Sequence, residues 1–177
     1  RRLGDADDLW LKSEPSAEEI EAEISRRASD AEEIVFGGDG EPPERLGTLL
    51  EVAGWIRRNT HASIRLDTNG LGNLINGRDI VPELAGAIDA VSVSLNASDA
   101  EEYQELCRPA FGPGSYDALL AFIEEIRGSV PDVTVSVVGG TIPEESLEKC
   151  ERMAGSWGVR FRVRRRTSSA FRARMKH

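Results

Sequence analysis

The stretch "EIVFGGDGEPPERLGTLLEVAGWIRRNTHASIRLDTNG" (residues 33–70) contains a strand, a helix and a second strand in that order. Its first apolar run, Ile34 to Phe36, is short and continuous, which is typical of a strand buried on both faces of a parallel sheet. Apolar residues then recur at helical spacing, at Leu46, Leu49, Leu50, Ala53 and Ile56. "SIRLDTNG" predicts a second strand that ends in an Asn-Gly turn. This order implies a right-handed crossover between parallel strands.

The same alternation extends in both directions from this unit. Upstream, residues 13–28 predict a helix, because Ser16 and Glu19 have the spacing of a capping box. Downstream we expect a short helix within 79–88, a strand at 90–96, helices at 99–107 and 116–128, a strand at 133–139, a helix at 143–157 and a strand at 159–164. The predicted class is α/β with five parallel strands. Periodicity does not distinguish an open doubly wound sheet from a complete or partial barrel.

Composition predicts one soluble globular domain. The chain has 177 residues, of which 40% are hydrophobic and 30% charged, and no apolar run approaches the roughly 20 residues that cross a bilayer. We therefore expect a cytoplasmic protein without a membrane partner. The net charge of −9 argues against general affinity for nucleic acid.

Positive charge collects at the end of the chain. Eight of the 22 basic residues lie between Arg160 and His177, with no acidic residue among them. We interpret residues 1–166 as the folded domain and 167–177 as a basic tail that is disordered. Binding of nucleic acid through this tail is the less favoured interpretation.

The cysteines and histidines predict neither a metal site nor a disulfide. Cys107 and Cys150 are 43 residues apart in the sequence, and neither His61 nor His177 stands near another ligand at a metal-site spacing. Asp39, Glu41 and Glu44 form a group of carboxylates without a histidine or a second acidic strand end, which is a weak basis for a metal site.

Two common catalytic motifs are absent. The sequence has no GxxxxGK[ST] phosphate loop, and Gly37, Gly38 and Gly40 lack the spacing of a dinucleotide fingerprint. No GxSxG nucleophile elbow occurs either.

Polar and glycine residues concentrate after four of the predicted strands, at residues 37–44, 67–77, 94–99 and 138–145. In parallel sheets, ligands bind at the carboxyl ends of the strands, where these loops converge. Ser94 and Asn96 alternate along one face of a strand end, so both can reach one ligand while Leu95 packs outward. Each loop taken alone also fits an ordinary helix-capping turn.

Together these loops resemble a known family. "GDGEP" (38–42), "TNG" (68–70) and "VSVSLN" (91–96) resemble the ends of three successive strands in radical S-adenosylmethionine (radical SAM) enzymes. Longer segments resemble the radical SAM group associated with TatD-type nucleases, namely "GEPPERL" (40–46), "TNGLGNLINGRDIVPEL" (68–84), "DAVSVSLNASDAEEY" (89–103), "LCRP" (106–109) and "GVRFRVR" (158–164).

The resemblance implies a partial (βα)6 barrel that binds S-adenosylmethionine at its strand ends. The family's binding roles fall on Gly38, Gly40, Glu41 and Pro42 for the methionine amino group, on Ser94 and Asn96 for the ribose, on Thr68 and Asn69 between them, and on Arg108 for a carboxylate or the substrate. It also implies a small-molecule or other unidentified substrate, with a TatD-type nuclease as an associated partner.

One family feature is missing. A CxxxCxxC loop after the first strand normally supplies three thiolates to a [4Fe-4S] cluster, and the sequence has no such motif. The five predicted strands correspond to five of the six family units, and the missing one is the first, which precedes the cluster loop. Because the sequence begins at Arg1, we interpret it as truncated, and expect the chain alone to be inactive. The alternative is a non-catalytic adenosyl- or nucleotide-binding module, or a degenerate relative that retains partner contacts.

Overall fold

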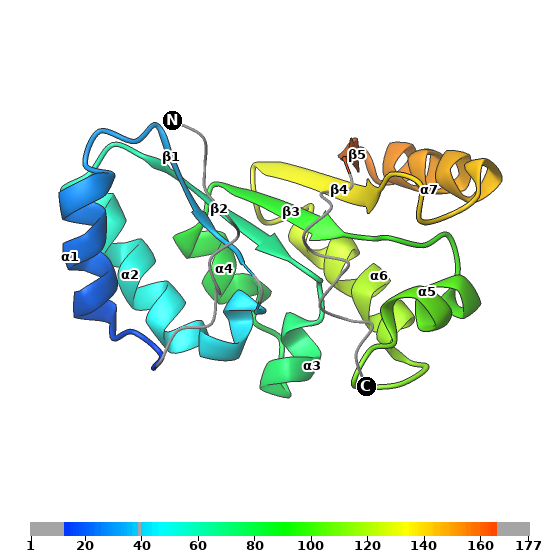
Figure 1. Cartoon of the computed structure of the whole chain (residues 1–177), viewed down its shortest axis with the longest axis horizontal. Coiled ribbons are helices and arrows are strands. Elements are labelled where there is room, and N and C mark those ends of the chain that lie inside the picture. Colours follow the sequence, from blue (N-terminus) through cyan, green and yellow to red (C-terminus); the bar gives the residue numbers. More distant parts are fainter. Residues whose placement is uncertain (1–12, 39, 166–177) are drawn as a thin grey trace, which may run out of the picture.

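The computed structural model of the chain describes residues 13–38 and 40–165. They form one parallel sheet flanked by helices (Figure 1). The strands are β1 Glu33–Phe36, β2 Ser63–Thr68, β3 Ala90–Ser94, β4 Asp132–Val138 and β5 Arg160–Arg164. All neighbouring strands are parallel, and their order in the sheet is their order along the chain. The predicted α/β class with five parallel strands is confirmed.

The helical elements connect the strands and precede the first of them. They are α1 Ala17–Arg27, η1 Pro42–Arg45, α2 Leu46–Asn59, α3 Gly72–Asn76, α4 Val81–Ala87, α5 Ala100–Cys107, α6 Ser115–Ile126 and α7 Glu144–Trp157. At α1 the predicted capping box is present: the Ser16 hydroxyl accepts from the Glu19 N–H at 3.3 Å, and Glu19 Oε2 accepts from the Ser16 N–H at 2.9 Å.

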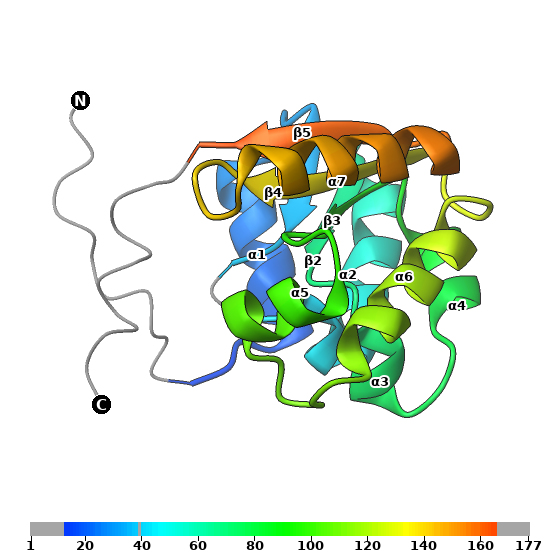
Figure 2. The same ribbon diagram turned by 90° about the vertical axis from the view of Figure 1, so that its right-hand side faces the viewer.

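The apolar core lies between the helices and one face of the sheet, here called the helix-covered face. Helices α1, α2, α4 and α6 lie along this side in both ribbon views, while α7 packs against β4 and β5 (Figures 1 and 2). Every second strand residue points into this core, including Ile64, Leu66, Val91, Val93 and Val135, all almost inaccessible to solvent. Because the strand order never reverses, successive right-handed crossovers place their helices on the same side.

The opposite side is polar and will be called the polar face. Its side chains alternate with the core residues and come from all five strands: Glu33, Val35, Arg65, Asp67, Ser92, Ser94, Asp132, Thr134, Ser136, Arg160, Arg162 and Arg164. No described helix packs there. The prediction that the first strand is buried on both faces is therefore wrong, and Val35 is 40% exposed.

The segment 67–77 contains a helix that the sequence did not predict. Its glycines and asparagines indicated a loop, but α3 forms within it, between Gly70 and Gly77. Gly70 has φ +78°, and a Cβ there would lie 2.4 Å from Leu119 Cδ1. Only glycine fits this turn, which brings α3 against α6.

None of the described helices has the length and apolar character that a membrane crossing requires. The proposed basic tail, residues 167–177, lies outside the described residues.

Candidate functional site

Glu41 connects the loops that follow β1 and β2. Its carboxylate accepts a hydrogen bond from the Thr68 hydroxyl and a second one, at 2.9 Å, from the Asn69 backbone N–H. Thr68 is itself buried, and its oxygen accepts from the Gly70 N–H at 3.0 Å. These bonds fix the two loops relative to each other at the carboxyl edge of the sheet.

Burial changes the acidity of this carboxyl group. Desolvation raises the pKa of Glu41 above its ordinary value, while the hydrogen bonds from Thr68 and Asn69 act in the opposite direction. A partly buried carboxylate with two donors is held in one orientation, because leaving it would cost those bonds.

The glycines before Glu41 leave the backbone accessible. Gly38 has φ +148°, and neither Gly38 nor Gly40 has any atom within 4 Å of the position where a Cβ would stand. Pro42 follows Glu41 and begins η1. A ligand can therefore approach the main chain closely at the two glycines.

The loop after β2 is fixed by its own side chains. Asn69 Oδ1 accepts from the Leu71 N–H at 2.8 Å, an Asx turn that leads into α3. Thr68 and Asn69 thus lie beside Glu41, and the hydroxyl of Thr68 both donates and accepts a hydrogen bond inside the protein.

Ser94 and Asn96 both contact the side chain of Arg164. Arg164 Nη2 donates to Ser94 Oγ at 3.1 Å and to Asn96 Oδ1 at 3.4 Å. Asn96 has φ +59°, in the left-handed region that asparagine tolerates better than most residues, and its Nδ2 lies 4.0 Å from Cys107 Sγ. Leu95 packs into the core and is inaccessible.

Arg164 is not among the candidate site residues predicted from the sequence, although it contacts two of them. The sequence places it in the predicted last strand, 159–164, without a role, and β5 orients it across β4 toward β3. The signal was present in "RFRVR" (160–164), where arginine alternates with apolar residues at the period of a strand. Such alternation places Arg160, Arg162 and Arg164 on one face.

Arg108 lies apart from this cluster of contacts. It ends α5 in a left-handed conformation, with φ +45°, and is exposed. Its backbone N–H donates to the Gln104 carbonyl at 3.2 Å. It is adjacent to Cys107, which contacts Asn96, but the structure does not bring its side chain to the other candidate residues.

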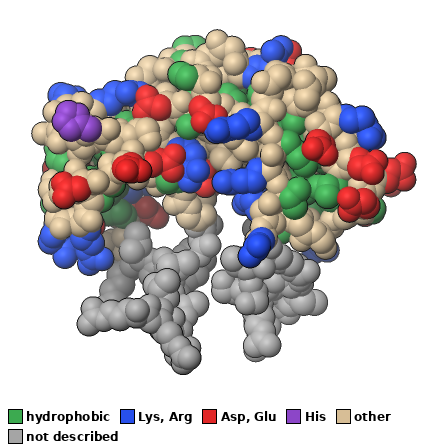
Figure 3. All heavy atoms as spheres, turned by 90° about the horizontal axis from the view of Figure 1, so that it is seen from above, with side chains coloured by type: hydrophobic (Ala, Val, Ile, Leu, Met, Phe, Trp, Pro, Cys, Tyr) green, Lys and Arg blue, Asp and Glu red, His purple; other side chains and the backbone are tan. Residues whose placement is uncertain are grey.

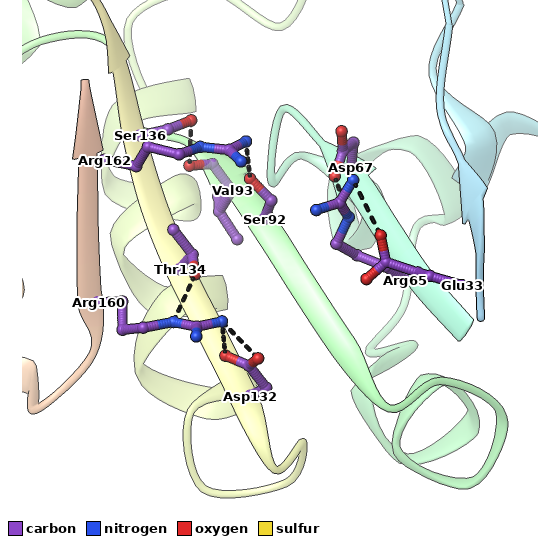
Figure 4. Close-up of polar contacts among 10 residues, drawn as sticks. All are labelled: Glu33, Arg65, Asp67, Ser92, Val93, Asp132, Thr134, Ser136, Arg160 and Arg162. Atoms are coloured by element: carbon purple, nitrogen blue, oxygen red, sulfur yellow. Dashed lines mark hydrogen bonds and ion pairs between the residues drawn. The ribbon is translucent and has the colours of Figure 1, made fainter. Parts of the chain in front are cut away.

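The polar face carries a groove of about 330 Å³ toward the amino edge of the sheet, where β1, β3, β4 and β5 begin. Its lining includes Glu33, Arg65, Ser92, Asp132, Thr134, Arg160 and Arg162. Figure 4 shows how several of these side chains reach toward one another from neighbouring strands. Seen from above, basic and acidic side chains are interspersed over the middle of the molecule (Figure 3).

The residues that the structure describes include no group of three or more His, Cys, Asp or Glu side chains able to hold a metal ion. Neither cysteine forms a disulfide, and Cys150 is inaccessible within α7. Burial raises the pKa of the Cys150 thiol to about 11, so it is protonated at neutral pH.

The sequence matches one known protein family. Residues 7–154 match the model of the Radical SAM superfamily. No curated protein matches the chain.

Two solved structures share the fold. A radical SAM methyltransferase from Sphaerobacter thermophilus superposes with a TM-score of 0.61 at 18% identity, covering 92% of this chain and 61% of that one. A domain of pyruvate-formate lyase-activating enzyme from Bacteroides vulgatus superposes with a TM-score of 0.51 at 14% identity, covering 75% of this chain and 98% of that one. At these identities the likeness concerns the fold, which agrees with the predicted partial barrel.

Proposed function

Because the chain belongs to the radical SAM superfamily, we propose that it binds S-adenosylmethionine at the carboxyl edge of its sheet. The observation that carries this proposal is the coupling of the first two strand-end loops through Glu41, which accepts from both Thr68 and Asn69. A site built on loops that are fixed before binding loses less conformational freedom when the ligand arrives.

The residues present suit the different parts of this ligand. Gly38 and Gly40, with open space at their Cβ positions, let the methionine amino group approach backbone carbonyls. Pro42 holds the following turn at η1. Ser94 and Asn96 offer a hydroxyl and an amide to the ribose.

Two of the candidate residues act as positioning residues in this proposal. Thr68 is buried and fully hydrogen-bonded, and Asn69 Oδ1 closes its own turn, so both orient Glu41 and the loops. Arg108 contacts a ligand carboxylate or the substrate, for which its exposed position on α5 leaves room.

The residues present do not fit the family's [4Fe-4S] cluster. Three thiolates are required, whereas the sequence has two cysteines, one at the end of α5 and the other buried in α7. We therefore propose that these 177 residues bind S-adenosylmethionine without cleaving it. Generation of the 5′-deoxyadenosyl radical, which is the family's chemistry, needs thiolates that this sequence does not supply.

Calorimetric titration with S-adenosylmethionine tests the binding proposal. Ser94→Ala should weaken binding by about tenfold through the loss of one ligand hydrogen bond. Asn96→Gly, which keeps the left-handed backbone and removes the amide, should act similarly. Ser63→Ala makes the same serine change at the amino edge of β2 and should leave affinity unchanged. Equal affinity in all four proteins would contradict the proposal.

Anaerobic incubation with iron and sulfide separates binding from catalysis. We expect no cluster absorbance and no 5′-deoxyadenosine. Product formation would show that the two cysteines suffice and would overturn the proposed inactivity. Tight binding of S-adenosylmethionine without iron and without 5′-deoxyadenosine is the behaviour of a non-catalytic adenosyl-binding module.

The subgroup within the superfamily and the substrate class can also be proposed. We propose that the substrate is a small molecule and that the domain belongs to the TatD-associated group, on the longer segments quoted above. Co-purification with a TatD-type nuclease, compared with an unrelated nuclease of similar charge, tests the association. Equal recovery of both nucleases would contradict it.

A further inference from the structure

Four arginines on the polar face differ in how their charge is balanced. Arg160 pairs with both oxygens of Asp132, and its Nε donates to Thr134 Oγ1 at 3.2 Å. Arg65 lies between two carboxylates, with Nη2 3.4 Å from Glu33 Oε2 and Nε 3.2 Å from Asp67 Oδ1. These two guanidinium groups are therefore neutralised within the protein (Figure 4).

Arg162 and Arg164 have no such partner among residues 13–38 and 40–165. Arg162 Nη2 donates to Ser92 Oγ at 3.5 Å, and Arg164 Nη2 donates to Ser94 Oγ and Asn96 Oδ1. All three acceptors are uncharged. In addition, Arg164 Nε is buried and has no hydrogen-bond partner among the described residues.

This arrangement places two like charges side by side, one exposed and one partly buried. The two residues are two positions apart on one strand, so their Cα atoms are about 6.6 Å apart and their side chains share a face. Burial lowers the pKa of Arg164, the charge of Arg162 lowers it further, and Asp67 raises it. Asp67 is already paired with Arg65. Arg162 is exposed, but the buried Nε of Arg164 lacks a partner among the described residues, which is costly. An oxyanion would neutralise both charges at once.

We propose that Arg162 and Arg164 form an anion site for a carboxylate or phosphate group of the substrate. Arg162 lines the groove on the polar face, whereas Arg164 is the last residue of β5 and contacts Ser94 and Asn96 at the carboxyl edge of the sheet. The anion thus lies beside Ser94 and Asn96, across the sheet from Gly38 and Gly40. Assigning it to the substrate rests on the proposed function, in which S-adenosylmethionine occupies the strand ends.

Titration with inorganic phosphate, followed by NMR of the arginine Nε–Hε signals, tests the site residue by residue. Signals of Arg162 and Arg164 should shift together and saturate, while that of Arg160 should stay in place. Arg162→Gln and Arg164→Gln should each weaken phosphate binding by roughly tenfold or more. Arg160→Gln, the matched control, should change it less than about twofold.

Three results would overturn the site. They are the lack of a saturable shift, an equal loss in Arg160→Gln, and full phosphate affinity in both glutamine variants. If Arg164→Gln fails to fold by circular dichroism, Arg164→Lys replaces it. Lysine keeps the charge but loses the planar fork, so binding should still weaken measurably.

A parallel titration with S-adenosylmethionine separates this inference from the function on which it rests. Phosphate and S-adenosylmethionine should bind simultaneously, although Arg164 also contacts Ser94 and Asn96. Mutual exclusion would overturn the assignment of the anion to the substrate. Absence of S-adenosylmethionine binding with phosphate binding intact would refute the proposed function and leave the anion site standing.

Discussion

The two faces of the sheet are built from the same five strands and serve different purposes. On the helix-covered face, residues such as Leu66 and Val93 are inaccessible and make the core. On the polar face, their immediate neighbours Asp67 and Ser94 contact arginines from the same or other strands. Because strand side chains alternate, one face can change its chemistry while the other keeps the fold.

The sharpest test of the covered side is Gly70→Ala. A methyl group there would meet Leu119, and φ +78° is unfavourable for alanine. We expect a loss of about 3 kcal/mol or more in the free energy of unfolding, measured by urea denaturation. Gly77→Ala, at φ +63° with open space around its Cβ position, isolates the backbone effect and should cost about 1 kcal/mol. Equal losses would show that packing against Leu119 is unimportant.

Adjacent residues on β3 test the division between faces directly. Val93→Ala should lower the free energy of unfolding by about 2 kcal/mol, because it leaves a cavity in the core. Ser94→Ala should change it by less than about 0.5 kcal/mol and reduce ligand affinity instead. An equal loss of stability in both variants would contradict the division of the sheet into a stabilising face and a ligand-binding face.

Glu41→Gln tests the connection between the loops after β1 and β2. It should lower the free energy of unfolding by about 1 kcal/mol. The raised pKa of Glu41 means that the folded chain holds this proton more strongly than the unfolded chain. The contribution of Glu41 to the free energy of unfolding is therefore full below the ordinary carboxyl pKa. It declines as the pH rises through the raised pKa of the folded state. The difference in unfolding free energy between wild type and Glu41→Gln should shrink over that range. A difference independent of pH would contradict the assignment.

The smallest effect is expected at the exposed end of the polar face. Arg160 and Asp132 form an ion pair whose side chains are 68% and 42% exposed, so Arg160→Gln should cost less than about 1 kcal/mol. Arg65→Gln should lower the free energy of unfolding more, because Arg65 is only 27% exposed and its replacement leaves Asp67 without a partner. Thermal unfolding of both variants provides the comparison, and a larger loss at Arg160 would reverse this ranking.

Much of the fold followed from local patterns. The capping box at Ser16 and the five strand segments depend on short-range periodicity, and the structure confirms them. Helix α3 was missed because its formation depends on packing of Gly70 and Gly72 against other elements, including Leu119 and Ile80. Local propensity carries no information about that contact.

The candidate site was only partly predictable, for a related reason. Ser94 and Asn96 were identified from strand alternation, but their partner Arg164 is about 70 residues away in sequence. Whether the polar side of the sheet would be covered by helices depends on strand order, which periodicity does not determine. The neutral partners of Arg162 and Arg164 therefore emerged only from the three-dimensional arrangement.

The position of β5 affects how the domain opens. In the described residues β5 pairs with β4 alone, so it is an edge of the sheet. It carries Arg162 and Arg164, the two arginines of the polar face that have no carboxylate partner in the described part of the chain. Edge elements exchange their amide hydrogens through local opening at a fraction of the global unfolding energy. Detachment of β5 would remove both guanidinium groups from the polar face. The other four strands would keep their packing against the core. An anion bridging Arg162 and Arg164 should therefore slow amide exchange in β5 more than in β2 or β3.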